Sequence, residues 1–226
     1  RGGAIKCDFV TPVIENCILK NTTGSAIWIF GASATFRNCV IIGTGGKTVF
    51  FDSNSSTPTF TNCTFVNNGQ YGLRNDQSYR PVVKNCIMYG NSSGGAFGNL
   101  DITYSLIEGG FSGNGNIDSD PLFVMLPPDT HEPTTEGNYR LFQSSPAIDA
   151  GDPETVLEGV FPVNEDGVFT DIEGDERIQD GRIDIGAYEG SELPPKFYVK
   201  NNDANPDGDG SDWENAFQNL EDAIAA

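Results

Sequence analysis

The residues best suited to chemistry are carboxylates gathered in two short stretches near the C-terminus. The first stretch, DANPDGDGSDWE, holds five carboxylates within twelve residues, and its glycines permit tight wrapping of the backbone. Calcium takes six to eight oxygen ligands from carboxylates, amides and carbonyls on loops of this kind. We therefore expect a calcium site at Asp203, Asp207, Asp209, Asp212 and Glu214, and a weaker one at Asp171, Glu173 and Asp175. The alternative is an ordinary acidic surface that keeps the protein soluble.

Residue types that serve in hydrolases and lyases are present, but they do not form a recognisable catalytic set. Asp118 and Asp120 could act as a carboxylate pair in acid/base chemistry, yet they lie in GNIDSDP, which is typical of a turn. The single histidine, His131, lies in the proline-rich stretch PPDTHEP. The sequence contains no GxSxG, P-loop or HExxH motif. We therefore expect no enzyme activity.

The charge of the chain is large, negative and unevenly distributed. The 226 residues include 13 Lys and Arg against 32 Asp and Glu, which gives a formal net charge of −19. This balance argues against a nucleic-acid partner. Residues 1–110 carry 8 basic and 6 acidic groups, whereas residues 111–226 carry 5 and 26. The sequence thus has two different halves, and neither contains an apolar run long enough to span a bilayer.

The first half contains an internal repeat. TPVIENCILKN, SATFRNCVIIG, TPTFTNCTFVN and RPVVKNCIMYG are variants of one unit, whose Asn-Cys pairs follow each other at steps of 22, 24 and 23 residues. A degenerate copy, LDITYSLIEGG, places Tyr104-Ser105 where the next pair should be. A second apolar segment recurs in phase with the first, at Ile5, Ile27, Val49, Leu73 and Phe97. Each period therefore holds at least two short strands separated by turns.

Such a unit cannot bury its own apolar residues, so the repeats must stack. Parallel strands lie ~4.8 Å apart, which places like residues over like residues in successive coils. The absence of helical spacing and of regularly placed leucines excludes helical hairpin repeats and leucine-rich horseshoes. We predict an all-β fold, a parallel β-helix with coils of about 23 residues, right-handed by the usual rule for parallel crossovers.

The repeat assigns a structural role to two columns of residues. Asn16, Asn38, Asn62 and Asn85 should form a ladder at one bend, where Asn tolerates left-handed backbone angles and its amide can bond to the coils above and below. Cys17, Cys39, Cys63 and Cys86 should form a neighbouring column of buried free thiols. A disulfide within the column and a metal site are the alternatives, but parallel side chains would have to twist to bridge, and no CxxC-like spacing is present. The inward-pointing residues of these strands should be Ile14, Phe36, Phe60 and Val83 before the pairs and Leu19, Ile41, Phe65 and Met88 after them.

The second half divides into two further segments. We expect residues 1–117 to form the regular coils, and residues 118–192 to extend the stack with irregular coils and close its end. LPP at residues 193–195 then reads as a linker. Residues 196–226 contain a strand, KFYVKNN, and an amphipathic helix with a capping box, Ser211 to Glu214. The residues expected to form a cap are Phe197, Tyr198, Val199, Trp213, Phe217, Leu220 and Ile224.

Several motifs of the second half resemble a known family. PLF, YRL, SPAIDAGD and DIEGDERI…RIDIGAYEG resemble the C-terminal choice-of-anchor Q region that follows β-helix repeats in large bacterial surface proteins. The TNCTFxNN coils resemble the right-handed β-helix repeats that precede it, including those of polymorphic outer-membrane-protein-like chains. FYVKNNDANPDGDGSDWENAFQNLEDAIA resembles the opening of such proteins, although here it follows the closing segment. The resemblance implies an exported protein at a bacterial cell surface or outside the cell.

These observations favour a structural or adhesive role. A cap-like segment at the wrong end of the chain predicts head-to-tail assembly, in which residues 196–226 cover the first coil of another copy or of the next repeat. The contact would then be heterologous and open, as a fibre requires. The alternative function is a polysaccharide-binding or polysaccharide-cleaving β-helix, with glycans as its partners.

Overall fold

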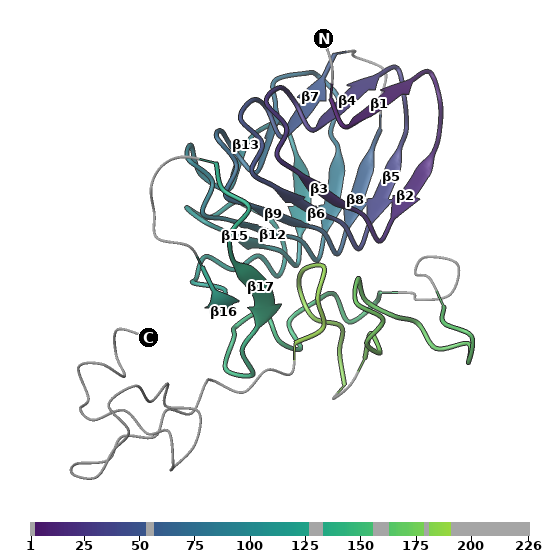
Figure 1. Ribbon diagram of the computed structural model, residues 1–226, viewed down its shortest axis with the longest axis vertical. Helices are drawn as coiled ribbons and strands as arrows, with labels where there is room; N and C mark the ends of the chain where they lie inside the picture. The colour runs from purple at the N-terminus through teal and green to yellow at the C-terminus, as the bar shows by residue number, and fades with distance from the viewer. Residues whose placement is uncertain (1–2, 53–56, 127–132, 156–162, 179–180, 191–226) are drawn as a thin grey trace, which may run out of the picture. The chain divides into compact units, whose positions relative to one another are not determined.

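The chain winds into coils of short parallel strands (Figure 1). The computed structural model describes residues 3–52, 57–126, 133–155, 163–178 and 181–190, and these contain strands but no helix. Residues 1–192 belong to one compact unit, and residues 193–226 lie outside the described part. The predicted parallel β-helix is therefore confirmed.

Each coil contributes one strand to each of three sides of the β-helix. The first side is formed by β1 (Ile5–Asp8), β4 (Ile27–Phe30) and β7 (Val49–Phe51), followed by the pair β10 (Leu73–Asn75) and β13 (Ala96–Gly98). The second side is a five-stranded sheet of β2 (Val13–Glu15), β5 (Thr35–Arg37), β8 (Thr59–Thr61), β11 (Val82–Lys84) and β14 (Asp101–Thr103). The third side is a five-stranded sheet of β3 (Ile18–Lys20), β6 (Val40–Ile42), β9 (Thr64–Val66), β12 (Ile87–Tyr89) and β15 (Leu106–Ile107).

The register stacks like residues over like residues, as the repeat predicted. In the second sheet Ile14 pairs with Phe36, Phe36 with Phe60 and Phe60 with Val83. The rings of Phe36 and Phe60 lie face to face with centroids 5.1 Å apart. Of the eight inward positions predicted, all are buried except Ile14 and Leu19, which are half-buried in the first coil. Alternation along each short strand thus builds one continuous apolar core.

The second apolar segment of the fifth coil is displaced by one residue from the repeat. Ala96, and not Phe97, pairs with Leu73 and points inward, while Phe97 pairs with Arg74. Because the side-chain period of a strand is two, a shift of one residue moves a side chain to the opposite face. Phe97 is consequently exposed on the outside of the β-helix.

The cysteine column lies inside the core, next to the bend. Each thiol donates to the carbonyl two residues before it, at 3.1 Å for Cys17, 3.2 Å for Cys39, 3.4 Å for Cys63 and 3.2 Å for Cys86. Ser105 repeats this bond at 2.9 Å in the degenerate coil, so its hydroxyl takes the place of a thiol. The five cysteines are free, and Cys17 in the first coil is the one that is not fully buried.

The third sheet is apolar on both faces, and this decides where the second half of the chain lies. In β6 and β9 every residue is buried. Ile41 and Phe65 point inward and belong to the core of the coils. Val40, Ile42 and Val66 point outward and belong to a second apolar cluster. A sheet with two apolar faces must be covered on both. The covering residues come from the second half and form a second core on the outer face, with Phe123, Tyr139, Leu141, Ala147, Ile185 and Ala187 as its main members.

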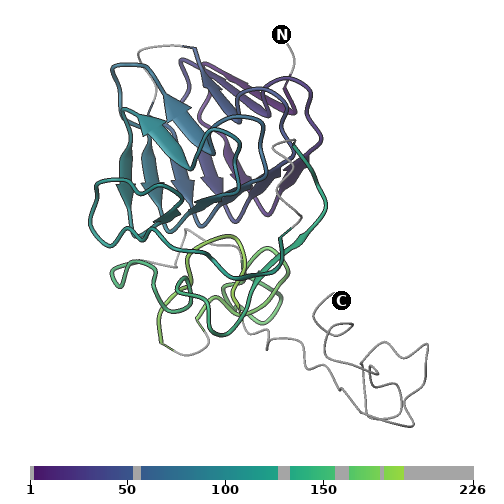
Figure 2. The ribbon, with the colours of Figure 1, turned by 90° about the vertical axis from the view of Figure 1, so that its left-hand side faces the viewer.

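The second half therefore differs from the expected continuation of the stack. Ile117 still pairs in parallel with Leu106, but the chain then leaves the coils and forms an antiparallel pair, β16 (Phe123–Met125) with β17 (Asn138–Leu141). Figure 2 shows the described green segments lying against one side of the coils. The described residues between 121 and 190 cover the flank of the β-helix because its third sheet carries outward-facing valines and isoleucines.

The burial of the thiols predicts that most of them react slowly with thiol reagents in the folded protein. Burial raises the pKa of Cys63 well above its ordinary value and also raises the pKa of Cys7, so both disfavour the reactive thiolate. With a thiol-specific chromogenic reagent at pH 8, we expect Cys17 to react first in the folded protein and all five thiols to react after denaturation in urea. Fewer than five thiols in urea would reveal a disulfide and contradict the free column.

Candidate functional site

The asparagine at each bend adopts the left-handed backbone conformation. The φ angles are 52° at Asn16, 50° at Asn38, 49° at Asn62 and 52° at Asn85, and Tyr104 takes the same position at 47°. L-residues avoid this region, and Asn tolerates it better than most because its short amide can bond locally. The predicted role of Asn as the bend residue is confirmed.

The side chains of the ladder bind a distant part of the chain. The Nδ2 of Asn38 donates to the carbonyl of Thr170 at 2.9 Å, and that of Asn62 donates to the carbonyl of Asp184 at 2.8 Å. The Oδ1 of Asn85 accepts from the backbone N–H of Asp152 at 2.8 Å. Neighbouring rungs bond directly at Asn85, whose Nδ2 donates to the Oδ1 of Asn62 at 3.2 Å. The ladder thus offers hydrogen-bonding groups to Asp152, Thr170 and Asp184, while Asn16 in the first coil remains exposed.

The RIDIGAYEG segment fits the ladder through its backbone. Gly186 has a φ of 111°, and a Cβ atom there would lie 2.8 Å from the Cδ1 of Ile87. Its N–H donates to the carbonyl of Asn85 at 2.9 Å, and the N–H of Ala187 donates to the Oγ1 of Thr64 at 3.0 Å. Glycine is needed at this position because the backbone approaches the sheet closely with a positive φ.

A buried arginine holds this segment against the bend. Arg177 has no exposed surface, and its Nη1 lies 3.0 Å from the Oε2 of Glu189. Its Nη2 donates to the Oδ1 of Asn38 at 2.7 Å and to the carbonyl of Gly186 at 3.0 Å. A buried charge must be paired and hydrogen-bonded to be tolerated, and removing one partner of such a pair typically costs about 3–5 kcal/mol. Arg177 therefore couples the ladder to the covering segment.

Two carboxyl groups beside Arg177 have raised pKa values. Burial raises the pKa of Glu189 to about 8, although the Arg177 guanidinium opposes this shift. Burial likewise raises the pKa of Asp184 to about 6, against the hydrogen bonds that it accepts from the backbone N–H groups of Gly190 and Asp149, both at 2.7 Å. Burial thus disfavours the charged forms of Asp184 and Glu189, and the hydrogen bonds and the ion pair that they form offset part of this cost.

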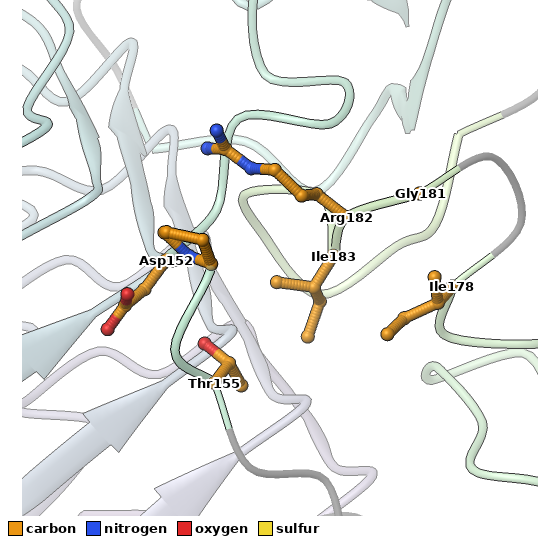
Figure 3. Close-up of a pocket in the computed structure, with 7 residues that line it drawn as sticks. Asp152, Thr155, Ile178, Gly181, Arg182 and Ile183 are labelled. Carbon is orange, nitrogen blue, oxygen red and sulfur yellow. The ribbon is translucent and has the colours of Figure 1, made fainter.

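A small pocket lies where this covering segment meets the ladder (Figure 3). The residues around it include Asp152, Thr155, Ile178, Arg182 and Ile183. The Asp152 carboxylate points away from Arg182 in Figure 3 and forms an ion pair with Lys84 at 2.6 Å. The Oγ1 of Thr155 accepts from the Nδ2 of Asn85 at 3.1 Å, so both Asp152 and Thr155 contact side chains of the coils.

The weaker calcium candidate forms a turn and an ion pair. The Oδ1 of Asp171 accepts from the backbone N–H groups of Glu173, Gly174 and Asp175 at 2.8, 2.9 and 3.0 Å. Its Oδ2 accepts from the N–H of Glu189, while Glu173 binds Arg140 through two bonds of 2.6 and 2.7 Å. Within the described ranges, no three His, Cys, Asp or Glu residues converge as metal ligands would. The structure therefore does not bring Asp171, Glu173 and Asp175 together around a cation.

The remaining candidate residues are placed as follows. The Oδ1 of Asp118 accepts from the N–H of Gly109 at 3.1 Å, and that of Asp120 from the N–H of Leu122 at 2.8 Å, so both act as turn acceptors. His131 lies outside the described residues. Outside them too lie the main calcium candidates, Asp203, Asp207, Asp209, Asp212 and Glu214, and the cap residues Phe197, Tyr198, Val199, Trp213, Phe217, Leu220 and Ile224.

Sequence reasoning missed the residues that make the interface. Arg177, Asp184 and Glu189 lie within the motifs that carry the family resemblance, but nothing in their spacing says that they are buried. A second ladder was also missed, in which the Nδ2 of Asn68 donates to the Oδ1 of Asn91 at 2.9 Å. The signal that could have found it is the 23-residue step between these two asparagines.

The raised pKa values predict that the protein is more stable at acid than at alkaline pH. Because the folded-state pKa values of Asp184 and Glu189 exceed the ordinary 3.8 and 4.5, their contribution is complete below those values. It is lost as the pH rises through about 6 and about 8. We expect the urea midpoint of unfolding to fall between pH 5 and pH 9, and Glu189→Gln to flatten the fall above pH 6. An equal slope in the variant and the parent protein would contradict this assignment.

Comparison with known proteins agrees with the coils. Residues 3–113 match a family model described as a right handed beta helix region. No curated protein matches the chain. Among the described residues there is also no helix with the length and apolar character needed to cross a membrane. The stacked coils and the match over residues 3–113 agree in showing a right-handed β-helix in this part of the chain.

Proposed function

We propose that the protein is a structural and adhesive module of a bacterial extracellular or cell-surface fibre, and that modules join head to tail. The observation that carries the proposal is the sequence of residues 196–226, which predicts a strand and an amphipathic helix suited to cover the end of a β-helix. Among the described strands, β1, β2 and β3 each pair on one side only, with β4, β5 and β6. An unpaired edge of this kind is a template for another chain segment.

The same edge exposes apolar side chains. Phe9 is 72% exposed, Val13 54% and Ile18 55%. In the next coil Val13 is matched by the polar Thr35 and Ile18 by the buried Val40. The half-buried core residues Ile14 and Leu19 lie at this end too. A partner that adds a strand and covers the end of the core would satisfy both the backbone and the apolar surface.

The proposed partner is residues 196–226 of a neighbouring copy or repeat. Their sequence predicts one strand, which could pair with the edge, and one amphipathic helix, which could cover the end of the core. The residues proposed to make the contact are those of the predicted cap, Phe197, Tyr198, Val199, Trp213, Phe217, Leu220 and Ile224.

The proposed location and the proposed lack of enzyme activity have separate support. The resemblance to choice-of-anchor Q regions favours export to a bacterial surface, and the strongly acidic composition favours solubility there. The engagement of Asp118 and Asp120 in backbone turns favours a binding role over a polysaccharide-cleaving one. Polysaccharide binding is the second candidate function, and the aromatic side chains on the outer face of the first side favour it, where Phe97 is exposed and Trp28 and Phe50 are half-buried.

Truncation tests the head-to-tail contact. We expect the full chain to form threads visible by electron microscopy, and a chain that ends at Pro195 to sediment as a single small species. Val13→Lys with Ile18→Lys should also block assembly, because Lys on an edge strand opposes strand addition. Val82→Lys is the matched control, since Val82 lies in the same outward column as Val13, three coils away, and is 41% exposed. Unchanged threads after truncation would reject the proposal.

Calcium binding at residues 203–214 is proposed as a separate feature. We expect calorimetric titration of the metal-free full chain to show calcium uptake, and Asp207→Asn with Asp209→Asn to abolish it, because the neutral amides remove two anionic ligands. The control is Asp171→Asn, since Asp171 is already engaged by backbone N–H groups. Equal uptake by the double variant and the parent would contradict this site.

A further inference from the structure

The chain contains two Asn-Gly dipeptides, Asn68-Gly69 and Asn114-Gly115. In such a dipeptide the backbone nitrogen of the glycine can attack the side-chain carbonyl carbon of the asparagine, because the two atoms belong to one short stretch of chain. Glycine also has no Cβ atom that would hinder the approach. The attack closes a succinimide ring and releases ammonia. The structure places the two dipeptides in opposite surroundings.

Asn68-Gly69 is held away from this reaction. Asn68 is 1% exposed, and its Oδ1 accepts from the N–H of Thr44 at 3.0 Å. Its Nδ2 donates to the carbonyl of Ile41 at 3.1 Å and to the Oδ1 of Asn91 at 2.9 Å. The N–H of Gly69 donates to the carbonyl of Thr44 at 2.8 Å. Both the side chain and the attacking nitrogen are therefore engaged.

Asn114-Gly115 lies at the surface, next to the fifth coil. Both residues are exposed. The carbonyl of Asn114 accepts from the N–H of Tyr104 at 2.8 Å, and a Cβ atom at Gly115 would collide with the Tyr104 ring. Within the described ranges, the N–H of Gly115 has no hydrogen-bond partner. The attacking nitrogen is thus accessible, and the Tyr104 ring packs against the peptide that reacts.

The hydroxyl of Tyr104 lies at the atom that has to leave. The Nδ2 of Asn114 donates to the Oη of Tyr104 at 2.8 Å. An amide nitrogen leaves readily only when it gains a proton, and a hydroxyl within hydrogen-bond distance can supply one. Tyr104 occupies the bend position that asparagine holds in the other four coils, with a φ of 47°. The departure from the repeat therefore places a proton donor beside an exposed Asn-Gly.

We propose that Asn114 is a site of self-catalysed deamidation in which Tyr104 is the general acid. Hydroxide from the solvent removes the proton of the Gly115 nitrogen, which forms a bond to the Cγ of Asn114. The Cγ–Nδ2 bond breaks as the Oη of Tyr104 donates its proton to Nδ2, ammonia leaves, and water returns a proton to Tyr104. Water then opens the succinimide to aspartate or isoaspartate.

The product changes the last coil with time after folding. Either form adds one negative charge at residue 114, and isoaspartate also lengthens the backbone at the position whose carbonyl binds the Tyr104 N–H. The reaction needs only water and no second protein. This inference is independent of head-to-tail assembly and of polysaccharide binding.

The test follows the full-length protein during incubation at pH 8. Ammonia release and peptide mapping with isoaspartate detection measure the modification of each asparagine. We expect Asn114 to react faster in the folded protein than in protein unfolded with guanidinium chloride, and Asn68 to react only after unfolding. Tyr104→Phe should slow the reaction of folded Asn114 by about tenfold, less than the effect of a buried general acid, because water partly replaces the hydroxyl at an exposed site.

Two controls separate this chemistry from folding. Asn114→Gln keeps a side-chain amide but should abolish the reaction at this position, since its attack must close a larger ring. Tyr104→Phe should keep the parent's thermal midpoint, because the ring that packs on Gly115 remains. The comparison of folded with unfolded parent protein needs no substitution. Unmodified Asn114 in the folded protein, a rate no faster than in the unfolded chain, or equal rates in Tyr104→Phe and the parent would each overturn the proposal.

Discussion

The left-handed asparagine at each bend is the constraint on which the rest of the structure depends. The chain passes from the second sheet to the third through an Asn-Cys pair in four coils and through Tyr104-Ser105 in the fifth, so a single residue changes the direction of the chain at each bend. Glycine could take the same backbone angles, but it has no amide. The amides of Asn38, Asn62 and Asn85 are the groups that bind the second half of the chain. Asparagine thus shapes the bend of the coil and also provides the hydrogen-bonding groups on its flank.

The second half of the chain is held by polar contacts at the bend and by apolar contacts beside it. Val40, Ile42 and Val66 on the outer face of the third sheet pack against the covering segment, so the hydrophobic effect drives the association. The polar groups fix its register, because Arg177, Asn38 and Glu189 are buried and each must find its partner. Several carboxylates of the acidic half serve as acceptors for backbone N–H groups, as Asp171 and Asp184 do, and are not available as a metal site.

The two proposed interactions use different surfaces of the β-helix. Head-to-tail growth would use the edge strands β1, β2 and β3 at the end of the coils. Polysaccharide binding, the second candidate function, would use the outer face of the first side, while the acidic cover contacts the bend and the third sheet. A fibre built in this way could therefore repeat the same binding face in every module, which raises the effective affinity for a long ligand.

A 22- to 24-residue repeat with alternating apolar residues specifies the coils, because stacking is the way to bury those residues. It also predicted the inward positions of Phe36 and Phe60 and the bend asparagines, since these depend on local spacing. Contacts made in the folded chain place the described residues between 121 and 190 on the flank, bring Arg177 to Asn38 and turn Phe97 outward. These facts depend on contacts between residues more than a hundred positions apart, or on a one-residue register, and neither leaves a periodic signal in the chain.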